Sequence, residues 1–223
     1  MANKYWWPSG GTGSSTGNWS STTNWSSSSA SYSSTTAPTV SDTANFGSYS
    51  GATAFTVTVD TGATCNGFIC NNANMTLAGS AAWTIAGSFT VTALASATFS
   101  GGITFTGSGA QTINTGGVSL ATAITLSASG ATYTLAAALT TTAALSLTSG
   151  TFDTSSTGNY SLSTSSIALN TGTKVLNLNA SNVTITNGGA SINWSLNSAG
   201  FTFNAGTSTF TFASTSIAFS LSL

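Results

Sequence analysis

Very few side chains in this sequence can take part in acid–base or nucleophilic chemistry. Among its 223 residues there are three acidic and two basic side chains, and histidine is absent. The acidic residues are Asp42, Asp60 and Asp153. General acid–base catalysis usually depends on His, Glu or Asp, and Ser–His–Asp or Cys–His systems require a histidine. We therefore expect no catalytic residue and no enzymatic activity.

The three carboxylates are also poorly placed to work as a pair. Hydrolysis of a glycosidic bond needs two carboxyl groups about 5 to 9 Å apart. Asp42 and Asp60 could approach each other, whereas Asp153 falls several repeats later in the chain. In its local sequence Asp42 is typical of a turn or capping residue, and Asp60 ends an alternating run. Because no cluster of carboxylates is visible, we expect neither a metal site nor a cofactor.

The cysteines Cys65 and Cys70 are the remaining reactive side chains. Without histidine or a nearby acidic residue they cannot complete a zinc site. A spacing of five residues puts them on opposite faces of one continuous strand. The Asn66–Gly67 pair between them could instead fold the chain back and bring them together. Two interpretations remain open, namely small buried core side chains and a local disulfide.

The element that would carry these residues is a short strand that recurs from about Phe55 to the end of the chain. Apolar residues alternate with Thr or Ser over a few positions, and Gly- or Ser-rich turns separate the runs. Alternation with period two is typical of a half-buried β-strand, and Thr suits the outer face of a strand. The runs include Phe55–Val59, Ile103–Phe105, Ala123–Leu126, Leu145–Leu147, Val183–Ile185, Phe201–Phe203, Phe210–Phe212 and Ile217–Leu221.

The number and brevity of these runs favour an all-β solenoid over a sandwich. About twenty strands are expected, whereas one sandwich uses roughly seven to nine. A parallel β-helix with about three short strands per turn would repeat every 20 to 25 residues or so. We therefore predict a β-solenoid shaft over residues 51–223. Its inward side chains are expected to be Val57, Ile103, Phe105, Ile124, Leu126, Leu147, Ile185 and Phe203.

Residues 1–50 differ in composition from the remainder of the chain. They hold Trp6, Trp7, Trp19 and Trp25, and they lack apolar alternation until the segment ends. A solenoid needs its first turn covered, since an open end exposes core and unpaired strand edges. We predict an irregular Trp-rich segment that caps the solenoid or docks onto a partner, with the four tryptophans outside the solenoid core.

Composition excludes several classes of protein. Only 2% of the residues are charged, whereas helices of soluble proteins normally carry charged residues on the face turned to solvent. The composition therefore argues against a helical protein. With a net charge of −1 the chain offers nothing to attract nucleic acid. No apolar run is long enough for a transmembrane helix, so we expect no membrane insertion. The N-terminus has no signal-peptide pattern, so export by cell lysis or within a particle is expected.

The opening of the chain resembles a known group of proteins. The phrases that carry the resemblance are the Trp-Trp-Pro-Ser-Gly-Gly-Thr-Gly stretch at residues 6–13, the Asn-Trp-Ser triplets at Asn18 and Asn24, residues 38–46, Phe55–Asp60 and Met75–Ser80. Over residues 3 to 80 or so they are similar to phage virion proteins of the tail-fibre or adhesin-like β-solenoid type. A looser similarity links them to bacterial autotransporter β-strand repeats. The resemblance implies an elongated structural protein on a virion or otherwise outside the cell.

Our leading hypothesis is a non-enzymatic shaft of a phage fibre or similar appendage, whose partners are other virion subunits. The alternatives are a bacterial extracellular adhesin or filament subunit, and a solenoid whose outward Thr and Ser columns bind a cell-surface glycan or ice. Thr56-x-Thr58 and Thr207-x-Thr209-x-Thr211 match the ice-binding phrase. Residues 216–223 form an alternating run without a polar cap, so we expect a homo-oligomer, either a trimer or a polymer.

Overall fold

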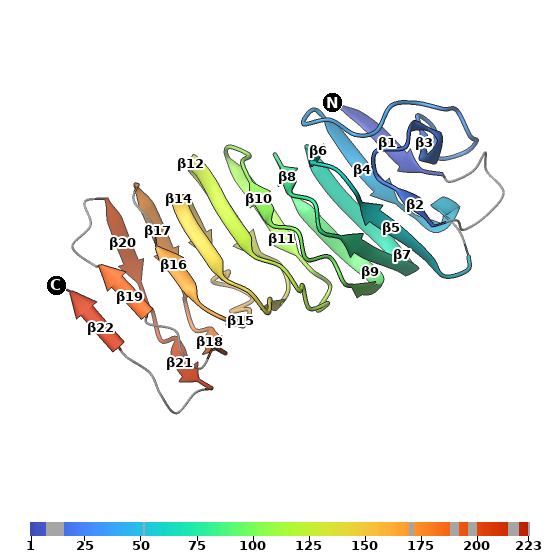
Figure 1. Ribbon diagram of the computed structural model, residues 1–223. Helices are drawn as coiled ribbons and strands as arrows, with labels where there is room; N and C mark the ends of the chain where they lie inside the picture. Colours follow the sequence, from blue (N-terminus) through green and yellow to red (C-terminus); the bar gives the residue numbers. More distant parts are fainter. Residues whose placement is uncertain are drawn as a thin grey trace.

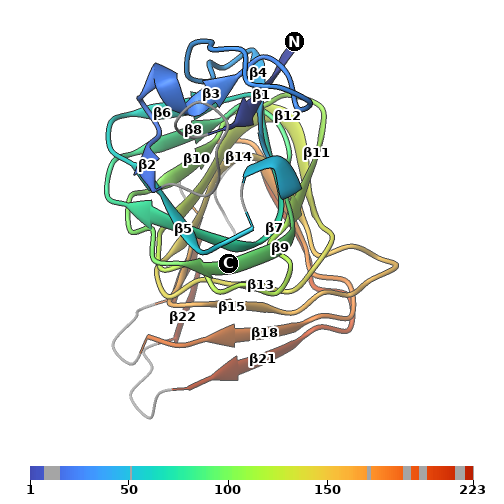
Figure 2. The same ribbon diagram turned by 90° about the vertical axis from the view of Figure 1, so that its right-hand side faces the viewer.

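The computed structural model describes residues 1–7, 16–50, 52–169, 172–187, 192–195, 200–213 and 219–222. The chain winds into an elongated β-solenoid of about six turns, with the two termini at opposite ends (Figure 1). Equivalent positions in neighbouring turns are joined by hydrogen bonds between residues 20 to 24 apart. The predicted fold class is therefore confirmed, with short strands on three faces that enclose the interior (Figure 2).

Face 1 is built from three-residue strands that stack in parallel and in register. Trp83, Ile103 and Ile124 lie at the same level of successive turns. These strands are short because a small-residue turn precedes each one and a corner follows it. In order, face 1 consists of β6 (Ala63–Cys65), β8 (Trp83–Ile85), β10 (Ile103–Phe105), the first parts of β12 (Ile124–Leu135) and β14 (Leu145–Asp153), and β16 (Ile167–Leu169).

Face 2 runs along the whole molecule. Its members are β1 (Ala2–Trp6), β4 (Asp42–Phe46), the first parts of β7 (Gly67–Gly79) and β9 (Phe89–Ala97), β11 (Ala110–Asn114), the second parts of β12 and β14, β17 (Lys174–Asn177) and β20 (Phe201–Asn204). β1 pairs in parallel with β4, and β4 with β7. The sheet therefore crosses the predicted domain boundary at residue 50 without a break.

Face 3 is divided between the two ends of the molecule. Near the N-terminus it contains β2 (Gly17–Asn18), β5 (Phe55–Val59) and the second parts of β7 and β9. Farther along it contains β13 (Leu139–Thr140), β15 (Leu162–Thr164), β18 (Asn182–Ile185) and β21 (Thr209–Phe212). β19 (Ile192–Ser195) pairs in parallel with β22 (Phe219–Ser222). The remainder of the alternating run predicted over residues 216–223 lies outside the described residues.

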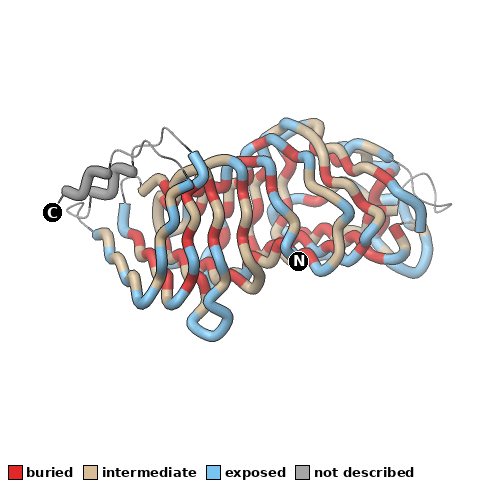
Figure 3. The backbone as a smooth tube through the Cα atoms, turned by 90° about the horizontal axis from the view of Figure 1, so that it is seen from below, coloured by how far each residue is buried: buried red, intermediate tan, exposed pale blue. Residues whose placement is uncertain are grey.

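The core follows the predicted alternation closely. Buried and less buried residues alternate along most strands (Figure 3). Seven of the eight predicted inward side chains are fully buried, namely Val57, Ile103, Phe105, Ile124, Leu126, Leu147 and Ile185. Phe203 packs against the core but is only half-buried. Its strand β20 pairs with β17 alone among the described strands, so one side of this turn lacks a neighbouring turn there.

Aromatic rings form a continuous chain through the N-terminal half of the core. Ring centroids are 5.2 Å apart for Trp19 and Trp83, 5.0 Å for Trp83 and Phe68, and 4.8 Å for Phe68 and Phe89. The chain continues to Phe105 and then Tyr133. Beyond this point the buried side chains are mostly Leu, Ile and Val. Such rings bury large areas and gain from edge-to-face contacts, so they contribute strongly to the packing of this half of the core.

Not every threonine faces outward as the alternation suggests. Thr122, Thr141 and Thr164 are buried where face 3 turns into face 1. Thr164 donates from Oγ1 to the carbonyl of Ala143 in the preceding turn at 2.8 Å. Thr122 and Thr141 donate in the same way to the carbonyls of Gly101 and Thr122. These bonds satisfy carbonyl groups at a corner where the backbone leaves the regular ladder.

Candidate functional site

The predicted docking or capping residues gather at the N-terminal end, but three of them belong to the main core. Trp6, Trp19 and Trp25 are fully buried in one cluster with the solenoid interior. Trp25 packs edge-on against Trp6 at 5.1 Å and against Trp19 at 5.0 Å. The expectation that these side chains lie outside the solenoid core is therefore wrong for these three. Burial leaves no indole face of the three available for a partner.

Trp7 is the exception, because it is half-buried. Its ring stacks on Tyr49 at 5.9 Å, and Tyr5 meets the Tyr49 ring edge-on at 5.4 Å. Tyr49 belongs to η3 (Ser48–Ser50), a 3-10 turn drawn over the N-terminal end in Figure 2. Of the four predicted tryptophans, Trp7 is the one whose exposure still fits contact with a partner.

The backbone at this end is closed as a cap requires. The two-residue strand β3 (Trp25–Ser26) pairs antiparallel with β1 and so covers its outer edge. The 3-10 turn η2 (Thr22–Asn24) leads into β3, and Trp25 donates from Nε1 to the carbonyl of Trp19 at 2.8 Å. Because β3 lies along β1, it covers backbone N–H and C=O groups of β1 that could otherwise pair with another chain. The geometry at this end is that of a cap.

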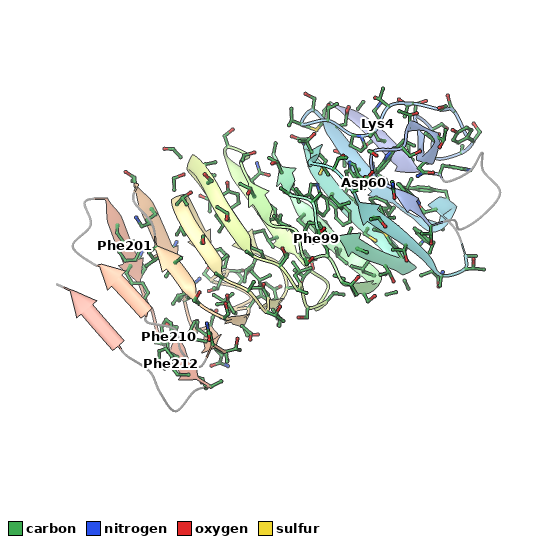
Figure 4. The ribbon with its side chains drawn as sticks, viewed as in Figure 1. Lys4, Asp60, Phe99, Phe201, Phe210 and Phe212 are labelled. Atoms are coloured by element: carbon green, nitrogen blue, oxygen red, sulfur yellow. The ribbon has the colours of Figure 1, made fainter. Side chains whose placement is uncertain are left out.

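Charged side chains help to hold the cap in place. Asp60 accepts hydrogen bonds from the amide of Ser20 at 3.0 Å and from its hydroxyl at 2.5 Å. Lys4 donates to Thr35 Oγ1 at 2.6 Å. Lys4 and Asp60 both lie in the N-terminal part of the molecule (Figure 4). These contacts join segments far apart in sequence, so they tie the cap to the first turns.

Hydrogen bonds also keep two of the carboxyl groups ionised. Burial alone would raise the pKa of Asp60, but the hydroxyl and amide of Ser20 outweigh it and hold this pKa below its usual value. Burial likewise acts against Asp42, whose pKa is nevertheless lowered by the Thr39 hydroxyl and amide and by the charge of Lys4. Both groups are therefore anionic at neutral pH, as hydrogen-bond acceptors rather than proton donors.

Acidification is expected to loosen the cap. Because the folded-state pKa of Asp60 is lowered, its contribution to stability is complete above the ordinary aspartate value of 3.8 and is lost as pH falls through the lowered value. Urea unfolding followed by tryptophan fluorescence should show a lower midpoint at about pH 2.5 than at about pH 5. Asp60→Asn should lose about 1 kcal/mol near pH 5 and show a weaker pH dependence. An unchanged midpoint in that variant would contradict the role assigned to Asp60.

The carboxylates are each occupied by different partners. Asp153 accepts from the amide of Ser155 at 2.7 Å and from the side chains of Asn177 and Asn179 at 3.2 and 2.9 Å. None of these contacts brings one carboxyl group next to another carboxyl group. Within the described ranges, no group of three or more His, Cys, Asp or Glu side chains is placed to hold a metal ion.

Cys65 and Cys70 are free thiols in the structure, so the disulfide alternative is not realised. Both are buried, one in β6 and the other in β7. Cys70 lies 3.2 Å from the carbonyl of Ala93, to which its thiol donates. Burial raises the pKa of Cys65 to about 12 and that of Cys70 to about 11. Neither is a thiolate at neutral pH, so both act as small core side chains.

A buried lysine was not expected from the sequence. Lys174 is 1% exposed and shares the inward side of β17 with Leu176. Its ammonium donates to the carbonyl of Gly172 at 2.9 Å and lies 5.8 Å from the centroid of the Phe201 ring. Burial lowers its pKa. The alternation could have predicted this burial, because Lys174 lies two residues before the apolar Leu176 and residues two apart on a strand share a face.

A hollow of about 460 Å³ lies at the corner between face 1 and face 2. We call it the corner groove and define it by Asn66, Gly67, Ile69, Ser88, Ser108 and Gln111, which come from three successive turns. Among the described residues that line it, none is a lysine, an aspartate or an aromatic residue. Alternation alone did not reveal it, because it is made by residues of different turns at the same corner.

Outward threonines form columns along the solenoid. On face 1, Thr64, Thr84, Thr104 and Thr125 occupy the same register position in successive turns. The two Thr-x-Thr phrases differ in exposure. Thr207, Thr209 and Thr211 are exposed, whereas Thr56 and Thr58 are half-buried. Hydroxyl columns of this kind are what a β-branched polar residue produces on any parallel ladder.

Comparison with known proteins returned no matching family model, no matching curated protein and no matching solved structure. Among the residues that the structure describes, no helix has the length and apolarity to cross a membrane.

Proposed function

We propose that this protein is a non-enzymatic structural and adhesive part of a phage fibre or a similar virion appendage, in which it forms an elongated shaft for attachment. The observation that carries the proposal is the β-solenoid of about six turns with one end closed by a cap. Each turn contacts mainly its neighbours, so length is gained by adding turns while the width stays constant. An elongated protein of constant width can act as a spacer that holds a binding site away from the surface of a particle.

The surface chemistry supports a structural role. Charged residues make up 2% of the chain, and Lys4, Asp42 and Asp60 are engaged in hydrogen bonds at the cap. Solubility then depends on Ser, Thr and Asn, which is adequate for a protein held in an assembly. Localisation on the particle surface, or otherwise outside the cell, follows from this proposal.

Self-association is part of the proposal. Among the described strands, β20, β21 and β22 each pair with one neighbour only. Phe201, Phe210 and Phe212 lie at the same end (Figure 4) and are half-buried. Strands at the end of a parallel stack, with apolar side chains beside them, are the usual place for pairing with another chain. Other subunits of the appendage, including further copies of this chain, are the partners we propose.

Immunogold labelling tests the proposed location. An antibody raised against the purified protein should label fibres of negatively stained virions, at positions that repeat from particle to particle. The same antibody, applied to uninfected host cells, serves as the control and should leave them unlabelled. Labelling of cell-surface filaments in the absence of particles would refute the virion assignment and identify a bacterial adhesin or filament instead.

A further inference from the structure

The corner groove has the size and preorganisation of a ligand site. Its volume of about 460 Å³ lies within the range of roughly 300 to 1,000 Å³ usual for small-molecule pockets. Gln111 donates from Nε2 to the carbonyl of Ser108 at 2.7 Å, and its Oε1 accepts from Ser88 Oγ at 3.3 Å. Ser88 Oγ also accepts from the amide of Thr112 at 3.0 Å. These bonds hold the Gln111 amide in one orientation. Its second N–H and the second lone pair of its oxygen can then bind a ligand.

A second amide faces the groove with only a weak partner. Asn66 Nδ2 lies 3.3 Å from the thioether sulfur of Met1, which is 91% exposed. A thioether is a poor acceptor compared with a hydroxyl or carbonyl oxygen. A ligand oxygen that displaces the Met1 side chain would therefore gain a better hydrogen bond with Asn66. Ile69, which is 43% exposed, adds an apolar patch on the groove wall.

Several classes of ligand do not match these groups. Nucleic acid and other polyanions require Lys or Arg, and neither is among the described residues that line the groove. Peptides that extend a sheet require an open strand edge. In the described part of the chain, β7 and β9 are paired on both sides where they line the groove. A strongly apolar ligand also matches poorly, because Ile69 and Met1 are the only large apolar side chains among the described residues that line the groove.

We propose that the corner groove binds a short segment of a neutral oligosaccharide. Sugar hydroxyls both donate and accept hydrogen bonds, and the amides of Asn66 and Gln111 offer both functions, with hydroxyls of Ser88 and Ser108 beside them. The C–H face of a sugar ring matches the apolar patch at Ile69. This inference rests on the attachment role proposed above for its biological meaning, and it names a neutral glycan as the attachment target.

Two substitutions test the groove without disturbing the fold. Gln111→Ala removes the oriented amide from a half-exposed position. Gly67→Ala fills the groove floor, where the added Cβ would meet Thr43 at 3.4 Å and Ser88 O at 3.7 Å, which are ordinary contacts. The matched control is Gly62→Ala, just before β6, where an added Cβ meets nothing within 4 Å. Circular dichroism and thermal unfolding verify that all variants remain folded.

Binding is measured on an array of neutral gluco-, manno-, galacto- and N-acetylglucosamine oligosaccharides, with alginate and heparin oligosaccharides as anionic probes. The wild type should bind one or more neutral probes. Gln111→Ala should weaken that binding about tenfold, the effect of one lost hydrogen bond. Gly67→Ala should weaken it too, and Gly62→Ala should not.

Three outcomes would overturn the proposal: binding to no neutral probe, binding to anionic probes alone, or neutral binding that both groove variants retain in full. Immunogold labelling reports the fibre location independently of the groove. A protein that labels fibres yet binds no saccharide therefore contradicts this inference alone.

Discussion

Replacing Trp83 by alanine is expected to lower the free energy of unfolding by about 3 to 5 kcal/mol. The side chain is 0% exposed in β8. Its ring lies 5.0 Å from that of Phe68, 5.2 Å from Trp19 and 5.9 Å from Phe99. Removing it leaves a cavity where the cap, face 1 and face 2 meet, and the surrounding rings cannot collapse into it together. Guanidinium unfolding followed by far-UV circular dichroism measures the loss.

Trp83→Phe is the matched control for that cavity. Phenylalanine retains most of the ring contacts and removes an indole N–H whose neighbour is the sulfur of Cys65, a weak acceptor. The loss should therefore be clearly smaller than for alanine. Phe105→Ala should fall in the same range of about 3 to 5 kcal/mol, since Phe105 is 2% exposed. A loss below about 1 kcal/mol in Trp83→Ala would show that the aromatic chain does not hold the core together.

The second large effect is expected at a glycine pair before β10. At Gly101 an added Cβ would approach the carbonyl oxygen of Ala81 in the preceding turn closer than 3.0 Å and the ring of Phe99 at 2.8 Å. At Gly102, the next residue, it would meet nothing within 4 Å. Gly101→Ala must therefore push two stacked turns apart, at a cost of about 3 kcal/mol.

Gly102→Ala controls for the general effect of replacing glycine. It should change the free energy of unfolding by less than about 1 kcal/mol, and in the stabilising direction if the unfolded chain loses freedom. The two variants are compared by denaturant unfolding under identical conditions. Equal stabilities would show that the turns are not stacked as closely at this corner as the structure has them.

The fold was predictable from the sequence because it depends on local periodicity. In Ile103–Phe105 and Ile124–Leu126 the apolar residues alternate with Thr, which determines which side chains face inward whatever the partner strand is. Small residues between the runs indicate short connections. Because each run is only a few residues long, one run can form one face of a solenoid turn and no more. The absence of His and Glu can likewise be read from the sequence alone, and the expectation of no enzymatic activity was based on it.

The candidate sites depended on contacts between distant residues, which local periodicity does not encode. Trp6 and Trp25 lie in irregular sequence, yet they complete the core because β1 pairs with both β4 and the antiparallel β3. Thr122 follows the pattern of an outward polar residue, but it is buried at a corner where a carbonyl of the preceding turn needs a donor. Gln111 and Asn66 meet in one groove because the register between turns brings their corners into line. Tertiary structure decided these features, since register and corner packing are set by the whole stack of turns.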